Sequence, residues 1–415
     1  MVDVRVQLAG TLTHDIECVY ISHPHVVTFG PNSTDIWEIT PDKVQHRSTL
    51  TPFIGAPERV GLRRRERGGV NFDHGREIII IASDGPEKHS LNVYGLRDGQ
   101  IIRSIEVPGR LDVRSVHYNN GYALAESLGG PEEDTNQNTR IYLYDVAGQG
   151  NLIRELSVPL DFVGGSLYAT FLPLGLTATQ DILAASSDYS EDRMCIFRWR
   201  GGRTRRSPSD TVEIGMEYGD QISTTSSILL DNDSFAINTF EFTQGEIQVG
   251  DASQSVIRRF DIPSLKEKWY SRPISGEVYS MRYVVSHKAI VAIGEVDEGK
   301  DPGSDFDWAT TVTVIDAGSG ALEHADKINH RKHGCAVREC DVSQVGDTID
   351  VVILFADGTV SVTPLDMFLL DGFEREGDSI KVHRVLSDGF QFSGGAVGQK
   401  SAILEGGSEF SLVRW

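Results

Sequence analysis

The chain has 415 residues, of which 39% are hydrophobic and 24% charged, a composition that excludes disordered and collagen-like proteins. Its 60 acidic and 39 basic residues give a formal net charge of −21. This charge opposes attraction to phosphate backbones and anionic lipid, so we expect no nucleic-acid partner and no membrane partner. The 42 glycines and 15 prolines favour many tight turns between short strands, which is typical of an all-β protein.

The N-terminal residues 1–12 alternate charged and apolar side chains, and no stretch has the pattern of a signal peptide or a membrane span. Four cysteines are too few to stabilise a domain of this size, so we expect a reducing, cytoplasmic setting. Two basic clusters, 63–67 and 198–206, interrupt the acidic composition. We interpret both as solvated loops and strand edges, with a local anion-binding patch as the alternative.

One phrase recurs eight times: an alternating apolar strand, a short polar or glycine turn, and a second alternating strand. The first strands of these pairs begin at Asp35, Leu91, Arg140, Met194, Val256, Thr311, Thr359 and Phe410. Apolar runs precede four of the pairs, at 77–82, 181–185, 289–293 and 351–356. Such runs are typical of strands that are covered on both faces, so each repeat is predicted to be a four-stranded blade.

No long window sustains a helical pattern, and only 366–373 is expected to form one helical turn. Four-stranded units repeated radially leave few open sheet edges. We therefore predict an all-β, single closed β-propeller over residues 1–415, with eight four-stranded blades, or seven if one phrase is decorative. The last phrase stops at Trp415 after its third strand, so the strand predicted at 3–12 is expected to complete that blade.

Two phrases from a third to a fourth strand, Leu91–Ile105 (LNVYGLRDGQIIRSI) and Ile141–Leu156 (IYLYDVAGQGNLIREL), resemble the WD40 family. The chain lacks that family's WD dipeptide and GH signature, and its repeats are longer, so no residue roles carry over. The resemblance implies a diverged WD40-like layout. In this layout, the connections between blades share one face with the second-to-third-strand loops, around the mouth of a central channel.

Three of the second-to-third-strand loops are unusually long, at 127–139, 241–255 and 294–310. Loops on a rigid scaffold carry recognition, so we expect a functional face there. Polar and aromatic residues interleave in the segments predicted to line the channel mouth. The ligand-binding candidates are Arg114, His117, Tyr168, Tyr279, Arg282, His333 and Arg338. Arginine supplies a fixed fork of donors and tyrosine a flat apolar surface, which suits an anionic or aromatic ligand; packing between blades is the alternative role.

Residue types that bind zinc gather at His330, His333, Cys335 and Cys340. If a strand starts at Cys335, Cys335 and Cys340 point to opposite faces and cannot share an ion. We therefore predict no metal, and no cofactor. No nucleophile elbow, P-loop, dinucleotide fingerprint or HExxH motif is present, so no catalytic residue can be chosen.

Two functions from different classes are compatible with these features. The first is a rigid binding scaffold that uses its loop-rich face and channel mouth to hold a protein or a small-molecule ligand. The alternative is a cofactor-free enzyme of the isomerase or cyclase type, which acts on a small organic metabolite in a pocket at the channel mouth. The choice between them, and the oligomeric state, follow from no pattern in the sequence.

Overall fold

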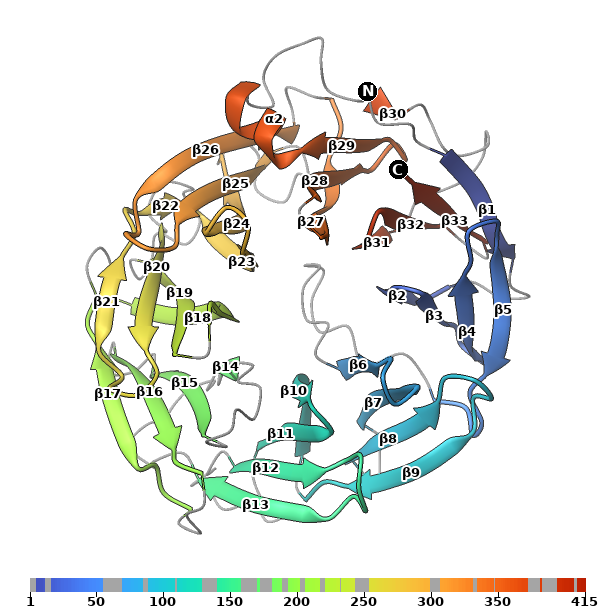
Figure 1. Ribbon diagram of the computed structural model, residues 1–415, viewed down its shortest axis with the longest axis horizontal. Coiled ribbons are helices and arrows are strands. Elements are labelled where there is room, and N and C mark those ends of the chain that lie inside the picture. The colour runs from blue at the N-terminus through green and yellow to red at the C-terminus, as the bar shows by residue number, and fades with distance from the viewer. Residues whose placement is uncertain are drawn as a thin grey trace.

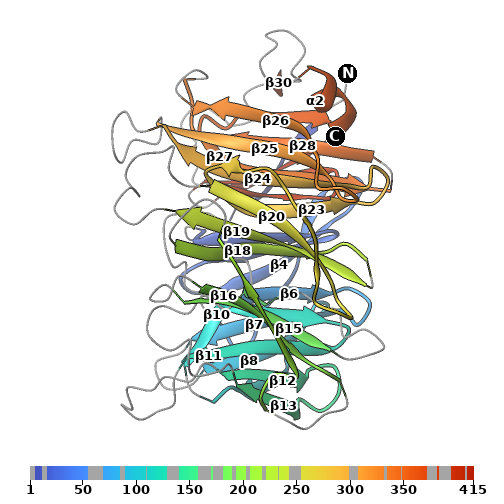
Figure 2. The same cartoon turned by 90° about the vertical axis from the view of Figure 1, so that its left-hand side faces the viewer.

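The computed structural model describes residues 5–11, 16–54, 69–84, 89–108, 110–128, 140–157, 170–171, 181–188, 193–201, 206–216, 221–231, 233–242, 254–298, 307–330, 334–346, 348–371, 381–382, 394–406 and 409–415. The chain forms a closed ring of eight antiparallel blades, seen along its axis in Figure 1 and edge-on in Figure 2. This architecture confirms the prediction of an all-β propeller with eight blades.

We number the blades in chain order and call their strands a to d from the centre outward. Blade 1 contains β2 (Cys18–Ser22), β3 (His25–Phe29), β4 (Thr34–Ile39) and β5 (Val44–Thr49). Blade 2 contains β6 (Val70–Asp73), β7 (Ile78–Asp84), β8 (His89–Gly95) and β9 (Ile101–Glu106). Blade 3 contains β10 (Arg110–Asn119), β11 (Tyr122–Leu128), β12 (Arg140–Asp145) and β13 (Leu152–Ser157). Blade 4 contains β14 (Thr170–Phe171), β15 (Ile182–Asp188), β16 (Arg193–Trp199) and β17 (Asp210–Ile214).

Blade 5 contains β18 (Gln221–Leu229), β19 (Ser234–Phe242), β20 (Gln254–Asp261) and β21 (Glu267–Tyr270), and the short β22 (Ile274–Ser275) also pairs with β20. Blade 6 contains β23 (Glu277–Val284), β24 (Ala289–Asp297), β25 (Trp308–Asp316) and β26 (Leu322–Asn329). Blade 7 contains β27 (Val337–Val345), β28 (Thr348–Phe355), β29 (Val360–Pro364) and β30 (Lys381–Val382). Blade 8 contains β31 (Gly394–Gly398), β32 (Ser401–Gly406), β33 (Glu409–Arg414) and β1 (Arg5–Thr11).

The first strand of every predicted pair is the c strand of a blade, and the four apolar runs lie in b strands. One short helix, α2 (Leu365–Asp371), follows β29 where a helical turn was expected. In the described part of the chain, no helix is long and apolar enough to cross a membrane.

The apolar core is divided into eight clusters, each of which lies between two neighbouring blades. Strand β7 shows the reason. Ile79 and Ile81 pack against blade 1, whereas Ile78, Ile80 and Ala82 pack against blade 3. Alternate residues of a strand point to opposite faces, so a strand with a blade on each side is apolar throughout.

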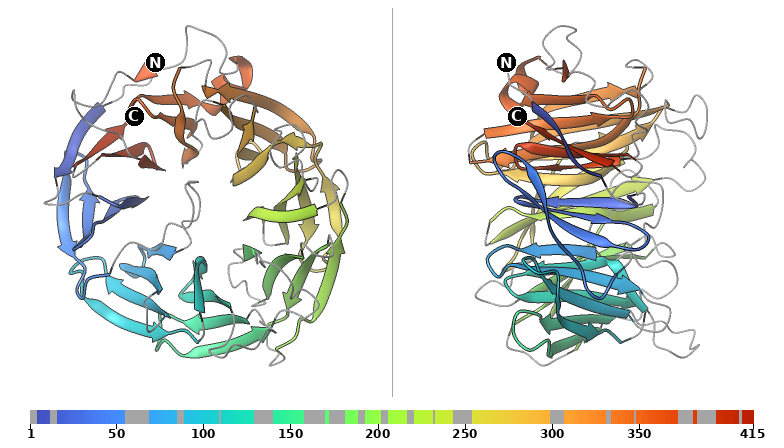
Figure 3. Two further views of the ribbon diagram at one scale, coloured as in Figure 1. Left: turned by 180° about the vertical axis from the view of Figure 1, so that it is seen from behind. Right: turned by 90° about the vertical axis from the view of Figure 1, so that its right-hand side faces the viewer.

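Strand β1 closes the ring. It pairs antiparallel with β33, from Arg5 opposite Arg414 to Thr11 opposite Glu409, and is the outer strand of blade 8. Both ends of the chain therefore lie in one sheet, which Figure 3 shows from behind and from the side. The prediction that the N-terminal strand completes the last blade is confirmed.

The c-to-d turns place glycines where the outer strand of the previous blade comes close. Gly150 and Gly320 both have a φ of +76°. A Cβ atom on Gly320 would lie 2.6 Å from the Trp269 ring of β21, and a Cβ atom on Gly150 would lie 2.5 Å from Arg103 Cδ of β9. Glycine tolerates both the left-handed backbone and the close approach, so these turns bring neighbouring blades into contact.

Arginines tie the same turns to the preceding blade. Five of them donate to backbone carbonyl oxygens of the next blade's c-to-d turn: Arg103 to Val146, Arg154 to Arg200, Arg198 to Ile262 and Pro263, Arg259 to Ala317, and Arg414 to Thr40 and Pro41. We call these five residues the junction arginines. They satisfy carbonyl groups that a turn leaves without a partner in the ladder, and they do so between blades.

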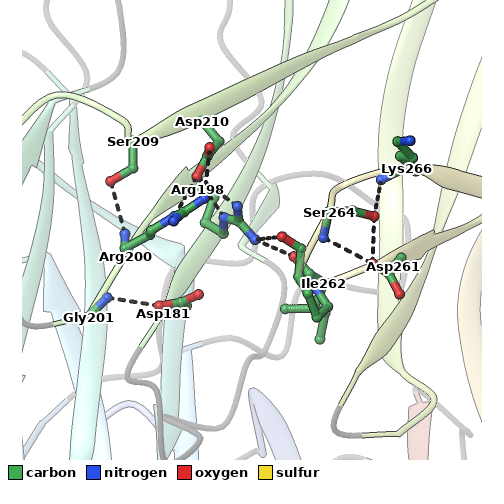
Figure 4. Close-up of polar contacts among 11 residues, drawn as sticks. Asp181, Arg198, Arg200, Gly201, Ser209, Asp210, Asp261, Ile262, Ser264 and Lys266 are labelled. Atoms are coloured by element: carbon green, nitrogen blue, oxygen red, sulfur yellow. Dashed lines mark hydrogen bonds and ion pairs between the residues drawn. The ribbon is translucent and has the colours of Figure 1, made fainter.

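The most buried junction arginine is Arg198, whose side chain is 4% exposed. Its guanidinium nitrogens lie 2.9 and 2.8 Å from Asp210 Oδ2, and Nη1 lies 2.5 and 2.7 Å from the carbonyl oxygens of Ile262 and Pro263 (Figure 4). The neighbouring Arg200 binds the same carboxylate but is 48% exposed. The interpretation of the cluster 198–206 as solvated is therefore wrong for Arg198, because this residue joins blades 4 and 5. The cluster 63–67 lies outside the described residues.

Candidate functional site

Each blade is an antiparallel a-b-c-d sheet, so its connections divide between the two faces of the ring. The d-to-a and b-to-c connections lie at one face, which we call the loop face. The a-to-b and c-to-d turns lie at the other, which we call the turn face. All three long connections join b to c strands and therefore belong to the loop face.

The strands beside these connections run further than the sequence predicted. Asp297 at the end of β24 pairs with Trp308 at the start of β25, so the predicted loop 294–310 shrinks to 298–307. Between the other two strand pairs, residues 129–139 and 243–253 remain. Asp307 is 2% exposed, so the end of the third connection is packed against the protein.

On four blades the a strand carries a bulge in its pairing with the b strand. The register shifts between Asp112 and Val116, between Thr224 and Ser226, between Val278 and Ser280, and between Val337 and Glu339. Three of these bulges contain a predicted ligand-binding residue, namely Arg114, Tyr279 and Arg338. A bulge re-aims the side chains of an inner strand and is common next to functional sites.

Two of these bulges lie on adjacent blades, near the start of β23 and of β27, and thus at the loop face. Tyr279 is half-buried against the apolar cluster between blades 6 and 7. Arg282 Nη2 lies 3.1 Å from Asp341 Oδ2 on β27, which joins the same two blades. The structure thus brings Tyr279, Arg282 and Arg338 to neighbouring inner strands. Tyr279 and Arg282 contact the adjacent blade, which was the alternative role, and ligand binding by all three residues stays a prediction.

His117 lies on β10 and is partly exposed. Burial lowers its pKa to about 4, because the charged imidazolium would lose solvent. The imidazole is therefore neutral at pH 7. The side chain of Arg114 and the whole of Tyr168 and His333 lie outside the described residues.

The segment with Cys335 and Cys340 differs in structure from the expected single strand. Strand β27 begins at Val337, so Cys335 precedes it, and Cys335 and Cys340 pack against the same apolar cluster. The argument that they point to opposite faces of one strand is therefore wrong. His330 is buried, 3.0 Å from Thr310 Oγ1. Across the described residues, no group of three or more His, Cys, Asp and Glu side chains is arranged to hold a metal ion.

Sequence reasoning missed a cluster of polar and aromatic side chains on the turn face. There His25 Nδ1 lies 3.2 Å from His74 Nδ1, and Ser22 Oγ lies 2.9 Å from His74 Nε2. The His74 ring also stacks on Phe72 at 5.8 Å between centroids. We call these four residues the histidine cluster. Burial lowers the pKa of both imidazoles, so both are neutral at pH 7.

Beside the histidine cluster, blade 3 contacts blade 2 through a charged group. Tyr118 donates to Asp73 Oδ2 at 2.6 Å, and Arg76 Nη1 lies 2.7 Å from the same oxygen. Burial would raise the Asp73 pKa, but the hydrogen bonds from Tyr118 and Arg76 outweigh it and hold this pKa below its usual value. Burial, together with this carboxylate, raises the pKa of Tyr118.

An alignment of the eight repeats could have indicated the histidine cluster. His25 and His74 both belong to the a-to-b turn region, one in blade 1 and one in blade 2. Side chains at matching places in adjacent blades meet, because neighbouring blades repeat the same geometry around the ring. The residues are about fifty positions apart in sequence, so no local motif contains both.

No protein-family model matches the chain, and no curated protein matches it by sequence. Among solved structures, the Dos1 propeller has a TM-score of 0.60 at 10% identity, covering 99% of this chain and 95% of that one. Kluyveromyces lactis Hsv2 has a TM-score of 0.49 at 13% identity, covering 84% and 93%. The β-propeller domain of Cps50 (Swd1) from Myceliophteria thermophila has a TM-score of 0.48 at 11% identity, covering 85% and 98%.

At these identities the likeness to the Dos1 propeller shows the fold alone, and the two lower scores carry no argument. The chain has the β-propeller fold that its resemblance to WD40 repeats implied, with eight blades. Its eight blades form a rigid scaffold, because each blade is packed on both faces and the ring is closed by a shared sheet.

Proposed function

We propose that the protein is a binding scaffold whose loop face holds a basic segment of a partner protein. The single observation that carries this proposal is the charge of the three long connections on that face. Residues 129–139, 243–253 and 298–307 contain nine acidic residues and one lysine. The basic cluster 63–67 belongs to a d-to-a connection of the same face, so the negative charge is a property of these three connections and not of the whole face. Charge of one sign gathered in them attracts a partner segment of the opposite sign and orients it during encounter.

The rest of the ring supports this assignment. Several c-to-d turns of the turn face bind the neighbouring blade, through glycine contacts and the junction arginines. Those groups hold the scaffold together at this face. The bulged inner strands of blades 6 and 7 reach the same face, so Tyr279 and Arg338 would contact a partner segment at the channel mouth.

The proposal is tested with a fluorescein-labelled nona-lysine peptide and fluorescence anisotropy. Neutralising three acids of one connection (E132Q/E133Q/D134N) is expected to weaken peptide binding about tenfold, because rim charges act through the local field. The matched control removes the same charge from the turn face, at exposed positions (D42N/D233N/E323Q). This control is expected to bind within about twofold of the unmodified chain.

An equal loss in both triple variants would mean that the peptide senses only net charge, and would overturn the proposal. A nona-glutamate peptide serves as the second control and is expected not to bind. Binding should also weaken steeply between low and physiological salt, because exposed charges are screened.

A further inference from the structure

The histidine cluster lies on the face opposite the proposed binding surface and joins two blades at their a-to-b turns. His25 Nδ1 and His74 Nδ1 approach to 3.2 Å across the junction of blades 1 and 2. The two ring planes differ by 13° and their centroids are 5.2 Å apart. The contact between the two Nδ1 atoms is a hydrogen bond, in which one neutral imidazole donates and the other accepts.

One proton therefore lies between the two nitrogens. If Ser22 Oγ accepts from His74 Nε2–H, then His74 Nδ1 accepts the proton of His25 Nδ1–H. If the hydroxyl donates instead, the direction of the second bond reverses. In both arrangements, the two Nδ1 atoms share one proton. The hydrogen bond with Ser22 Oγ fixes the orientation of the His74 ring.

The same two nitrogens have the spacing of metal ligands. Zinc–nitrogen bonds of about 2.0–2.1 Å at a tetrahedral angle place two ligand nitrogens about 3.3 Å apart. Binding requires both rings to turn, so that their lone pairs aim at a common point beside the line that joins the nitrogens. His74 is exposed and His25 partly exposed, so an ion can enter from solvent.

We propose that His25 and His74 form a binding site for a divalent transition-metal ion of the zinc class, bound through their Nδ1 atoms between blades 1 and 2. The ion takes the place of the proton that the two nitrogens share. The imidazole that carried this proton changes tautomer and carries it on Nε2 instead, so both ligands are neutral imidazoles. Water molecules complete the coordination shell. A bound ion would crosslink the inner turns of two blades.

The surroundings select the class of metal. Three carboxylates that act electrostatically on the two rings are each paired with an arginine: Glu38 with Arg47 at 3.0 Å, Asp73 with Arg76 at 2.7 Å, and Glu77 with Arg97 at 2.8 Å. The arginines compete with an ion for these carboxylates, so the ligands that the site offers are the imidazole nitrogens. Imidazole suits zinc, copper and nickel, whereas magnesium and calcium require oxygen ligands.

The test is isothermal titration of ZnCl₂ into the full chain, purified without a histidine tag and freed of metal with a chelator. One zinc ion per chain is expected to bind. The variants His25→Ala and His74→Ala are each expected to weaken zinc binding at least tenfold. Ser22→Ala is expected to weaken it about tenfold, because it releases the His74 ring.

The matched control is His287→Ala. This histidine lies in the a-to-b turn of blade 6 and pairs with Asp366 at 2.7 Å, so it resembles His74 in position but faces a carboxylate. Its removal is expected to leave zinc affinity unchanged. Circular dichroism verifies that each variant is folded, and Co²⁺ absorption reports nitrogen ligands independently of the affinity.

Zinc should also raise the thermal midpoint of the unmodified chain, because an ion that binds only the folded state stabilises it. The absence of saturable zinc binding would overturn the proposal. So would equal zinc affinity in His25→Ala, His74→Ala and the unmodified chain. Binding of MgCl₂ with similar affinity would also contradict it, since that would indicate oxygen ligands elsewhere.

Discussion

The two faces of the ring carry connections between the same strands, yet they differ in what those connections do. On the turn face, c-to-d turns touch the preceding blade through glycines, arginines and backbone hydrogen bonds, as Arg198 does with Ile262 and Pro263. On the loop face, three long acidic connections separate b from c strands. The difference shows that contacts between blades gather at one end of the repeated blade, which leaves the other end for the recognition that we propose.

The largest loss of stability is expected at the junction arginines of the turn face. Arg198→Ala is expected to lower the free energy of unfolding by about 2–4 kcal/mol, because it leaves the carbonyl oxygens of Ile262 and Pro263 without their donor and removes the buried partner of Asp210. Arg200→Ala is the matched control, since Arg200 binds the same Asp210 from an exposed position. Its loss is expected to cost about 0–1 kcal/mol. Urea unfolding followed by tryptophan fluorescence measures both, and equal losses would refute a special role for the buried residue.

The glycines that contact a neighbouring blade at the turn face are also expected to contribute to stability. Gly320→Ala is expected to cost about 2–4 kcal/mol, because the methyl group meets the Trp269 ring and the backbone is left-handed. Gly334→Ala tests the backbone alone: its φ is +64°, but nothing lies within 4 Å of the added Cβ atom. We expect about 1 kcal/mol there. Thermal unfolding separates the two, and similar losses would show that the interblade contact contributes little.

The stability of the fold is expected to depend on pH through His117 on β10. Its folded pKa of about 4 lies below the unfolded value of 6.5, so the unfolded chain binds more protons between these values. Stability is therefore lost as pH falls from 6.5 towards 4, and this group contributes no slope above 6.5. His117→Gln is expected to recover about 3 kcal/mol at pH 4, relative to its effect at pH 7.5. Unfolding curves at both pH values test this, and parallel pH profiles for variant and unmodified chain would contradict it.

The smallest effect is expected at the loop face itself. E132Q/E133Q/D134N should change the free energy of unfolding by less than about 0.5 kcal/mol, because surface charges contribute little to stability. The measurement is the same urea series, run beside Arg198→Ala. A large loss of stability would show that this connection helps to hold the scaffold, and would weaken the separation between the two faces.

Much of the architecture could be read from the chain alone. Runs such as Ile78–Ala82 are apolar throughout because a blade covers each face of the strand, and the recurring pairs of strands that follow such runs predicted eight blades. The unassigned strand at the N-terminus and the missing outer strand at Trp415 predicted the closure by β1. These features are local patterns that recur, so a single sequence contains them.

The candidate site depended on features that no local pattern contains. The bulges at Tyr279 and Arg338 arise from strand register, and the pairing of Arg282 with Asp341 depends on how blade 6 faces blade 7. The partners of Arg198 could not be predicted either. Its interpretation as a solvated residue was wrong, because the carbonyl oxygen that it binds belongs to the next blade.

By itself, then, the sequence determined the strands, their grouping into eight blades and the acidic character of three connections, because alternation, apolar runs and charge are properties of short segments. Only the tertiary structure decided which side chains meet between blades, such as His25 with His74. These contacts join residues about fifty positions apart. They depend on the curvature of the ring and on the exact depth of each turn, which no periodicity along the chain specifies.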